Sequence, residues 1–303
     1  MVDDHSEDGT RAVAQRGATK VLESLPTPEG WLGKTWACFQ GARTARGEIL
    51  VFLDADTTLE QNGLSNIIEN FVERDGVLSI QPYHKMRDLY EQLSAFFNII
   101  VMAGIGAFTV LGKRIKPLGL FGPVVVMNRQ DYLNSGGHDM VKGEILDDVA
   151  LGSQLQKKGT ELHCLAGKGT ISFRMYPNGI RELIHGWSKG YAMGAAKIPI
   201  PLLILIIAWI CGSIGTTRYL IEAIIAADIG QIAIWAILYI LYAAQIYWML
   251  VRIGSFRCYT ALFYPVPLVF FVLVFTYSFA RIFVVRSVKW KGRNISLKRK
   301  AAP

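Results

Sequence analysis

The sequence predicts an α/β domain over residues 1–190, followed by membrane helices over residues 191–285 and a basic tail over residues 286–303. Three observations lead to this prediction. In the first part, short apolar runs alternate with segments of helical spacing, which is typical of an open, mostly parallel sheet covered by helices. In the second part, long stretches carry no formal charge. The excess of basic residues surrounds those stretches.

The composition excludes several classes of protein. With 51% hydrophobic residues and a mean hydropathy of +0.30, the 303-residue chain is neither disordered nor an ordinary soluble enzyme. Residues 1–190 carry 20 basic and 22 acidic side chains, whereas residues 191–303 carry 12 and 2. A basic margin around apolar segments favours contact with anionic lipid headgroups. No basic and aromatic stripe is present, so we expect no nucleic-acid partner.

Three short apolar runs are expected to be strands: Ile49–Leu53, Val77–Ile80 and Val124–Met127. Runs of this length that end at turn or acidic residues are typical of buried strands. Apolar residues at helical spacing predict a helix over Leu64–Arg74. A second helix is expected over Val149–Lys158, because Gly159 can adopt the left-handed conformation that ends many helices.

Three charge-free stretches are long enough to cross a membrane, over about residues 199–218, 229–251 and 259–281. Roughly 20 helical residues, at about 1.5 Å each, match a hydrocarbon core of about 30 Å. Tyr, Trp and Arg side chains cluster at the ends of these stretches, as interfacial anchors do. We therefore expect a multi-pass protein of the cytoplasmic membrane. A fourth stretch, residues 94–112, is also charge-free.

Two pairs of carboxylates are placed where chemistry is expected. Asp54 and Asp56 follow an apolar strand, and ligands of α/β sheets bind outside the carboxyl ends of strands. Carboxylate oxygens at such a place can hold Mg²⁺ or Mn²⁺, although an ordinary acidic turn has the same sequence. Asp147 and Asp148 enter a predicted helix. They can cap it through the helix dipole, or one of them can act as a general base.

Three further segments are uninformative one by one. Asp3 and Asp4 lie in an acidic turn at the N-terminus. Lys34 follows a glycine-flanked tryptophan, before a helix, where its ammonium can meet a phosphate. Trp187 lies in the segment His185–Gly190, directly before the first membrane stretch, and this segment also fits an interfacial amphipathic helix.

Taken together and in this order, the five motifs resemble the membrane-bound family 2 glycosyltransferases, which have a GT-A fold. The resemblance covers nearly the whole chain. Five segments further resemble the bacterial diaponeurosporenoate glycosyltransferases, which transfer glucose from UDP-glucose to a carotenoid carboxylate. These segments are Ser79–His84, Phe121–Val124, Phe173–Tyr176, Gly186–Lys189 and Val288–Arg293.

The resemblance implies a role for each acidic residue near the donor. Asp4, with Asp3 beside it, matches the acid that contacts uracil in the family. Asp54 and Asp56 match the family's DxD motif, which binds the nucleotide sugar and Mg²⁺ or Mn²⁺. Asp56 is the expected direct metal ligand.

The remaining roles concern the reaction itself. Asp148 matches the family's catalytic carboxylate, and Asp147 matches the acid that precedes it. Lys34 is expected to bind the nucleotide sugar through its phosphates. Trp187 matches the tryptophan of the QxxRW motif and is expected in the donor and acceptor pocket. Leu183 and Gly186 replace the Gln and Arg of that motif, which favours a single transfer over polymer synthesis.

The resemblance implies inverting transfer of a hexose to a membrane lipid, with a carotenoid carboxylate as the expected acceptor. Two alternatives stay open. The acceptor can be another lipid alcohol, such as a hopanoid, a diacylglycerol or a sphingoid base. The chain can also be a truncated, non-catalytic membrane scaffold, because its start lies where the family completes its second strand and the expected GT-A domain lacks its first strand.

The topology follows from the expected cytosolic donor. Residues 94–112 must not cross the membrane, because Asp56 and Asp148 act on one side. We expect this segment in the interface, anchored by Phe96, Phe97 and Phe108. Three crossings after it would export the seven basic residues of the tail, against the positive-inside rule. Two prolines in the third stretch can make it re-entrant and leave the tail in the cytosol.

Overall fold

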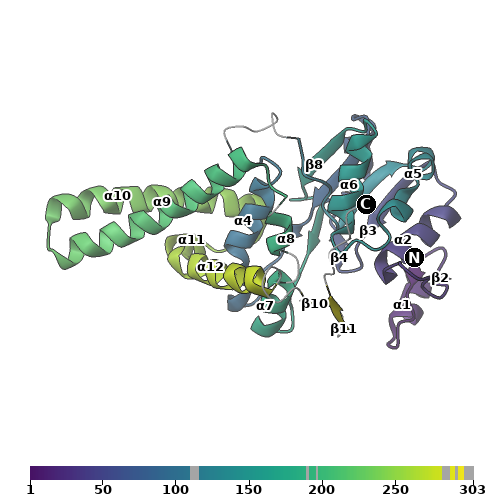
Figure 1. Ribbon diagram of the computed structural model, residues 1–303, viewed down its shortest axis with the longest axis horizontal. Coiled ribbons are helices and arrows are strands. Elements are labelled where there is room, and N and C mark those ends of the chain that lie inside the picture. The colour runs from purple at the N-terminus through teal and green to yellow at the C-terminus, as the bar shows by residue number, and fades with distance from the viewer. Residues whose placement is uncertain (110–115, 189–190, 196, 282–286, 291–292, 297–303) are drawn as a thin grey trace. The chain divides into compact units, whose positions relative to one another are not determined.

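The computed structural model describes residues 1–109, 116–188, 191–195, 197–281, 287–290 and 293–296. The chain forms two compact units (Figure 1). Unit 1 comprises residues 1–82 and 117–170, and unit 2 comprises residues 83–116 and 171–303. Most of the predicted basic tail lies outside the described residues.

A four-stranded sheet forms the centre of unit 1, in the order β3, β7, β5, β8. Its strands are β3 (Ile49–Leu53), β7 (Val124–Asn128), β5 (Val77–Gln81) and β8 (Leu162–Ala166). β7 runs antiparallel to both of its neighbours, whereas β5 and β8 pair in parallel. The three predicted strands are confirmed. β3, β5 and β8 therefore run in one direction, as a mostly parallel sheet predicts, and β7 alone runs against them. The reversal of β7 was not predicted, because apolar runs report burial and carry no information on strand direction.

The other elements of unit 1 surround this sheet. β1 (Val2–Asp3) and β2 (Leu22–Glu23) form a separate parallel pair. The remaining elements are α1 (Thr10–Gly17), α2 (Gly33–Thr44), β4 (Thr57–Leu59), α3 (Gly63–Val72), α5 (Arg129–Ser135), the 3₁₀ helix η3 (Gly137–Val141) and α6 (Asp147–Lys157).

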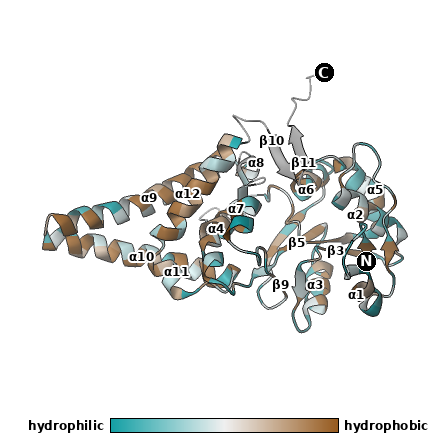
Figure 2. Ribbon diagram, turned by 90° about the horizontal axis from the view of Figure 1, so that it is seen from below, coloured by the Kyte–Doolittle hydropathy of each residue, from teal (hydrophilic) through white to brown (hydrophobic). Residues whose placement is uncertain are grey.

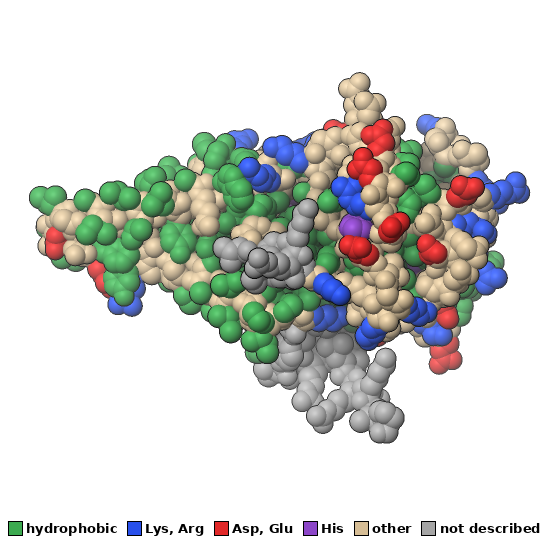
Figure 3. Space-filling model, turned by 90° about the horizontal axis from the view of Figure 1, so that it is seen from above, with side chains coloured by type: hydrophobic (Ala, Val, Ile, Leu, Met, Phe, Trp, Pro, Cys, Tyr) green, Lys and Arg blue, Asp and Glu red, His purple; other side chains and the backbone are tan. Residues whose placement is uncertain are grey.

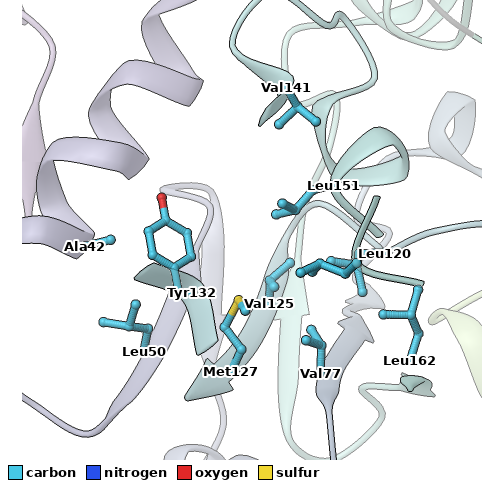
Figure 4. Close-up of a cluster of buried hydrophobic side chains, with 11 residues drawn as sticks. Ala42, Leu50, Val77, Leu120, Val125, Met127, Tyr132, Val141, Leu151 and Leu162 are labelled. Carbon is cyan, nitrogen blue, oxygen red and sulfur yellow. The ribbon is translucent and has the colours of Figure 1, made fainter. Parts of the chain in front are cut away.

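The core of unit 1 holds the helices α2 and α6 in place. Figure 4 shows Ala42 of α2 and Leu151 of α6 in one buried cluster with the strand side chains Leu50, Val125 and Met127. Burial of such side chains stabilises the fold by roughly 1.5–3 kcal/mol each. The helices α2 and α6 are therefore fixed against the sheet, which matters because each carries a charged residue of the site.

Both predicted helices of unit 1 are present. In α3, Ile67 and Phe71 lie four residues apart and are both buried, as the helical spacing predicts. α6 begins at Asp147, two residues earlier than predicted, so the acidic pair forms its first turn. The helix ends before Gly159, whose φ of +88° is the left-handed conformation expected there.

Unit 2 begins with short elements around an ion-paired arginine. β6 (Tyr83–His84) pairs in parallel with β9 (Ile171–Phe173). The helices are η1 (Leu89–Ser94), α4 (Ala95–Ala103), α7 (Ile180–Ser188) and α8 (Tyr191–Ala195). Arg174 donates from Nε to the buried Glu91 at 2.7 Å and from a terminal nitrogen to Asp88 at 2.6 Å. This pair of bonds fastens η1 to the segment that follows β9.

α4 forms the first half of the predicted interfacial segment and is buried inside unit 2. Phe96 and Phe97 are both 0% exposed. Their ring centroids lie 5.7 Å from Trp209 and 5.0 Å from Phe271, respectively. The prediction that these two phenylalanines anchor the segment in lipid is therefore wrong. A helix that is apolar on all sides can be buried in protein or in lipid, and its sequence does not separate the two.

Two long helices form an antiparallel hairpin. α9 (Ile200–Ile225) and α10 (Ile229–Ile253) are each long and apolar enough to cross a membrane. Figure 2 shows that both are mostly hydrophobic, and Figure 3 shows hydrophobic side chains along the visible face of the hairpin. Only 22% of the most apolar window of each helix is buried, unlike the core helix of a soluble protein. These features are consistent with a transmembrane region.

The third predicted span is broken into two shorter helices, α11 (Cys258–Leu262) and α12 (Pro265–Phe279). At its start, Thr260 Oγ1 donates to Gln92 in η1 at 2.5 Å. In its middle, Tyr264 donates to the carbonyl of Ser213 in α9 at 3.1 Å. At its end, Ser278 donates to the carbonyl of Ser188 in α7 at 2.9 Å.

The two ends of this segment lie at the same end of the hairpin. η1 and α7 contact each other, since Trp187 Nε1 donates to Ser94 Oγ at 3.0 Å. His84 forms a β-bridge with Gly254, directly after α10 ends. The chain therefore leaves the end of α10, reaches the middle of α9 and returns. After it, β10 (Ser287–Trp290) and β11 (Arg293–Ser296) form an antiparallel pair.

Candidate active site

The antiparallel pairing of β3 and β7 places Asp54 beside the loop that precedes β7. Leu53 is paired with Val124, so the end of β3 and the start of β7 are neighbours. The backbone N–H of Asp54 continues this ladder and donates to the carbonyl of Pro123 at 3.0 Å. The first carboxylate of the DxD motif thus starts from a fixed backbone position next to Gly122.

The first turn of α6 lies against the same loop. The backbone N–H of Leu120 contacts the carbonyl of Asp148 at 3.4 Å. Gly119 packs on the backbone of Val149 so closely that a Cβ would lie 2.5 Å from its Cα. Only glycine permits this approach, which brings the acidic pair of α6 to the edge of the sheet where Asp54 lies.

Lys34 joins the two carboxylates. Its Nζ lies 3.0 Å from Asp54 Oδ1 and 3.2 Å from Asp148 Oδ2. Lys34 is in the first turn of α2, and the neighbouring Thr35 donates to the carbonyl of Lys142 at 2.9 Å, which fixes this end of the helix. Three segments that are far apart in the sequence therefore meet at one ammonium group.

Burial and charge set the protonation of this group of residues. Burial lowers the pKa of Lys34, but the charges of Asp148, Asp147 and Asp54 outweigh it and hold the pKa above its ordinary value. Burial raises the pKa of Asp148, and Lys34 offsets part of that rise. The pKa of Asp54 moves upward for the same reason and with the same offset. At neutral pH the lysine is charged and compensates two buried carboxylates.

Two residues that carry no charge shape the site, and neither had an individual role in the sequence-based prediction. Ser79, which is 0% exposed, donates to the carbonyl of Phe121 at 2.9 Å and accepts from its N–H at 2.7 Å. Gly122 leaves room for a carboxylate: a Cβ there would lie 3.0 Å from Asp148 Cγ and 3.4 Å from Lys34 Nζ. Ser79 and Gly122 both lie in segments that resemble known enzymes, and this resemblance is the sequence signal that could have identified them.

The N-terminal acids lie near the start of α2, the helix that carries Lys34. Asp3 ends β1, is 3% exposed and accepts from the N–H of Ser6 at 3.4 Å. Asp4 is exposed, and one of its oxygens lies 2.6 Å from where a Cβ of Gly33 would be. Gly33 is the first residue of α2, so Asp4 supplies negative charge to a helix start that has no acidic residue of its own.

The carboxylates at the site are suited to a hard divalent cation. Burial raises the pKa of Asp56, and the charge of Asp54 adds to that rise, so a cation between them is favoured. One oxygen of Asp147, Oδ2, is buried and has no hydrogen-bond partner in the described part of the chain. Across that same part, no three acidic, histidine or cysteine side chains are grouped as a complete metal site. Asp54 and Asp56 therefore offer a partial set of ligands.

Trp187 belongs to unit 2, whereas all the charged residues above belong to unit 1. It is 7% exposed, stacks on Phe97 with ring centroids 4.7 Å apart, and contacts Tyr191 at 5.8 Å. A Cβ at the preceding Gly186 would overlap the ring of Tyr176, so the turn of α7 needs glycine here. The structure thus places Trp187 in an aromatic cluster, and its predicted role in a pocket stays a prediction.

An α/β unit whose strand ends carry a DxD pair, a lysine and an acidic helix start is the arrangement of a glycosyltransferase. The chain belongs to glycosyl transferase family 2, whose family profile matches residues 1–130. It is 34% identical over 303 residues to the 4,4'-diaponeurosporenoate glycosyltransferase of Staphylococcus haemolyticus (strain JCSC1435), an alignment that covers 98% of this chain and 80% of the relative. The enzyme of that name from Staphylococcus aureus (strain USA300) is 30% identical over the same shares.

The chain is also similar to solved structures, at low sequence identity. The match to a mannosyltransferase from Pyrobaculum calidifontis covers 88% of this chain and 75% of the mannosyltransferase, with a TM-score of 0.46 and 17% identity. The match to a glucosyl-3-phosphoglycerate synthase from Mycobacterium tuberculosis covers 65% of this chain and 68% of the synthase, with a TM-score of 0.38 and 16% identity. The family assignment rests on the sequence relatives above.

Proposed function

We propose that this enzyme transfers glucose from UDP-glucose, with inversion, to the carboxylate of a carotenoid acid. The convergence of Asp54, Lys34 and Asp148 from three separate segments carries the proposal, because it places a cation and two acids where a nucleotide sugar is expected. The names of its relatives, which match nearly the whole chain, support the carotenoid acceptor.

The donor is held by groups at the ends of the strands and helices of unit 1. Asp3 and Asp4 recognise the uracil ring from the end of β1. Lys34 neutralises the diphosphate, and its pKa keeps it charged at every physiological pH. Asp54 and Asp56 would hold Mg²⁺ or Mn²⁺, which stabilises the charge of a leaving diphosphate when bound.

Asp148 is the proposed base. For an alcohol acceptor it takes the proton that the hydroxyl loses as the new bond to the sugar carbon forms. A carboxylic acid acceptor is already ionised at neutral pH, because its ordinary pKa is about 4. In that case Asp148 acts through its charge and its position, with Asp147 beside it.

The buried, ion-paired position of Asp148 also favours a second candidate acceptor, a lipid alcohol. A general base contributes roughly 10²- to 10⁴-fold to a reaction that needs proton removal. Asp148→Asn therefore separates the two acceptors: it slows transfer to an alcohol by that factor and slows transfer to a carboxylate much less. Asp56→Ala is severe for both.

In the membrane, we place α9 and α10 as two crossings of the cytoplasmic membrane with the catalytic residues in the cytosol, where UDP-sugars are found. The excess of basic residues near the end of α10 supports this orientation. We retain residues 1–190 as the catalytic domain and Trp187 as a residue of the donor and acceptor pocket.

The test uses membranes that contain the full chain, supplied with UDP-glucose, Mn²⁺ and a C30 carotenoid acid. Mass spectrometry of the lipid extract should detect a glucosyl ester. Asp139→Asn is the matched control, because Asp139 is an exposed surface acid paired only weakly with Lys142 at 3.5 Å. If UDP is released with a lipid alcohol and not with the carotenoid acid, the acceptor is a lipid alcohol and the proposed carboxylate acceptor is wrong. Absence of UDP release with every acceptor would contradict the enzyme's proposed reaction.

A further inference from the structure

The end of the α9–α10 hairpin where α10 finishes carries three arginines stacked on aromatic rings. The guanidinium carbon of Arg252 lies 4.2 Å from the ring centroid of Trp248. The corresponding distances are 5.9 Å from Arg257 to Tyr259 and 5.7 Å from Arg281 to Tyr277. We call these three arginines and their ring partners the arginine belt.

The three arginines lie at one end of unit 2, although they come from different helices. Arg252 is in the last turn of α10, and Arg257 directly precedes α11. Arg281 follows α12, whose last turn bonds to α7 through Ser278. The chain between Arg257 and Arg281 goes to the middle of α9 and returns. The fold therefore brings Arg281 to the end of unit 2 where Arg257 lies, although the two are distant in the sequence.

The belt has positive charge without acidic partners. No acidic residue occurs between Tyr247 and Arg281 in the sequence. Among the residues that the structure describes, none of the three arginines forms an ion pair, and their side chains are not buried. The other end of the hairpin is different, because Arg218 is paired with Glu222 at 2.7 Å and Asp228 adds a further negative charge.

We propose that the arginine belt is a binding site for the headgroups of anionic phospholipids. Arg252 donates one terminal N–H to the carbonyl of Trp248 at 2.6 Å, and Arg281 donates one to the Tyr277 hydroxyl at 3.4 Å. A guanidinium has five N–H groups, so each of these arginines has others for the oxygens of a phosphate. The exposed rings of Trp248 and Tyr277 are amphipathic and favour the headgroup level of a bilayer. Charge complementarity selects an anionic lipid over a zwitterionic one, and the belt thereby fixes which leaflet this end of the hairpin occupies.

The size of the effect follows from the number of charges. A basic residue at an anionic membrane surface changes partitioning by about fivefold, the equivalent of about 1 kcal/mol. Three arginines acting together therefore give on the order of 100-fold preference for an anionic lipid over a neutral one. The preference weakens with added salt, because the belt is exposed to solvent ions.

The experiment measures which lipids stay on the full-length protein. The protein is reconstituted in phosphatidylcholine with a minor share of phosphatidylglycerol and repurified, and the ratio of the two retained lipids is measured by mass spectrometry. The triple variant Arg252→Gln, Arg257→Gln, Arg281→Gln should reduce the enrichment of phosphatidylglycerol by ten- to about 100-fold. The triple lysine variant keeps the charge and should retain most of the enrichment, which also shows that the fold tolerates these changes.

Arg218→Gln is the matched control, because it removes an arginine from the same hairpin that is already neutralised by Glu222. It should leave the enrichment unchanged. Wild-type enrichment in the triple glutamine variant would overturn the proposal. An equal loss in the control, or displacement of the lipid by millimolar inorganic phosphate, would overturn it as well.

Discussion

Gly122→Ala should displace the proposed base without disturbing the backbone. An added Cβ would overlap Asp148 Oδ2, lie 3.0 Å from Asp148 Cγ and lie 3.4 Å from Lys34 Nζ. Gly122 does not have a positive φ, so alanine is conformationally acceptable there and acts through these contacts alone. The carboxylate must shift by about 1 Å, and a misplacement of this size costs about 100-fold in rate.

The assay compares kcat for Gly122→Ala with kcat for wild type by UDP release with a lipid alcohol as acceptor, because transfer to a carboxylate depends much less on a base. Gly17→Ala is the matched control, because a Cβ at Gly17 meets nothing within 4 Å and its φ is not positive. Thermal denaturation of both variants in detergent checks that the fold is retained. A Gly122→Ala enzyme with wild-type kcat would show that Asp148 does not depend on this space, and the assignment of the base would fail.

Three further predictions follow from the protonation and topology of the chain. For an alcohol acceptor, kcat/KM should rise with pH through a pKa above the ordinary aspartate value, because burial raises the pKa of Asp148 and its deprotonated form is the base. Lys34→Met should move this rise in kcat/KM to higher pH, because it removes the positive charge beside Asp148. A rise at the ordinary aspartate pKa would contradict the assignment of Asp148 as the base. Burial lowers the pKa of His138 to about 4, and its Nδ1 lies 2.9 Å from the Tyr132 hydroxyl oxygen. As the pH falls, this histidine therefore gains its proton in the unfolded state before it does so in the folded state. The free energy of unfolding should therefore fall by roughly 3 kcal/mol as the pH drops from about 6.5 to about 4, and this part of the fall should be absent in His138→Phe. Ile295→Cys, in a background without other cysteines, should resist a membrane-impermeant label applied to intact cells, and labelling would place the tail outside.

The strands and helices of unit 1 could be predicted because each has a local cause. The apolar runs that form β3, β5 and β7 are short and bounded by polar residues, glycine or proline, and α3 shows its buried face in the spacing of Ile67 and Phe71. The common direction of β3, β5 and β8 agrees with the prediction, but the reversal of β7 could not be predicted, because it depends on how the chain returns between strands. The burial of α4 could not be predicted either, since lipid and protein interiors select the same apolar residues.

The acidic residues of the site could be recognised from the sequence, but their arrangement could not. The DxD pair and the acidic start of α6 are each ambiguous alone, and the ion pairs of Lys34 with Asp54 and Asp148 join positions up to 114 residues apart. Ser79 and Gly122 received no role because a buried hydroxyl and a missing side chain carry no charge pattern. Ser79 holds the backbone of Phe121, and Gly122 leaves space for the Asp148 carboxylate. Both roles can be recognised only when the three-dimensional neighbours of these residues are known.

The path of α11 and α12 removes the conflict that three crossings create. With α9 and α10 as two crossings, Arg252 and Arg257 return to the side from which α9 started. The following segment is anchored at that side through Thr260 and Ser278, and its turning point at Tyr264 bonds to the middle of α9. In the proposed orientation, the end of α12 lies on the side of these arginines, and a cytosolic tail stays a prediction from the positive-inside rule, since most of the basic residues after Val285 lie outside the described residues. Pro265 and Pro267 are the local cause, because they separate the segment into two helices, neither of which has the length of a span.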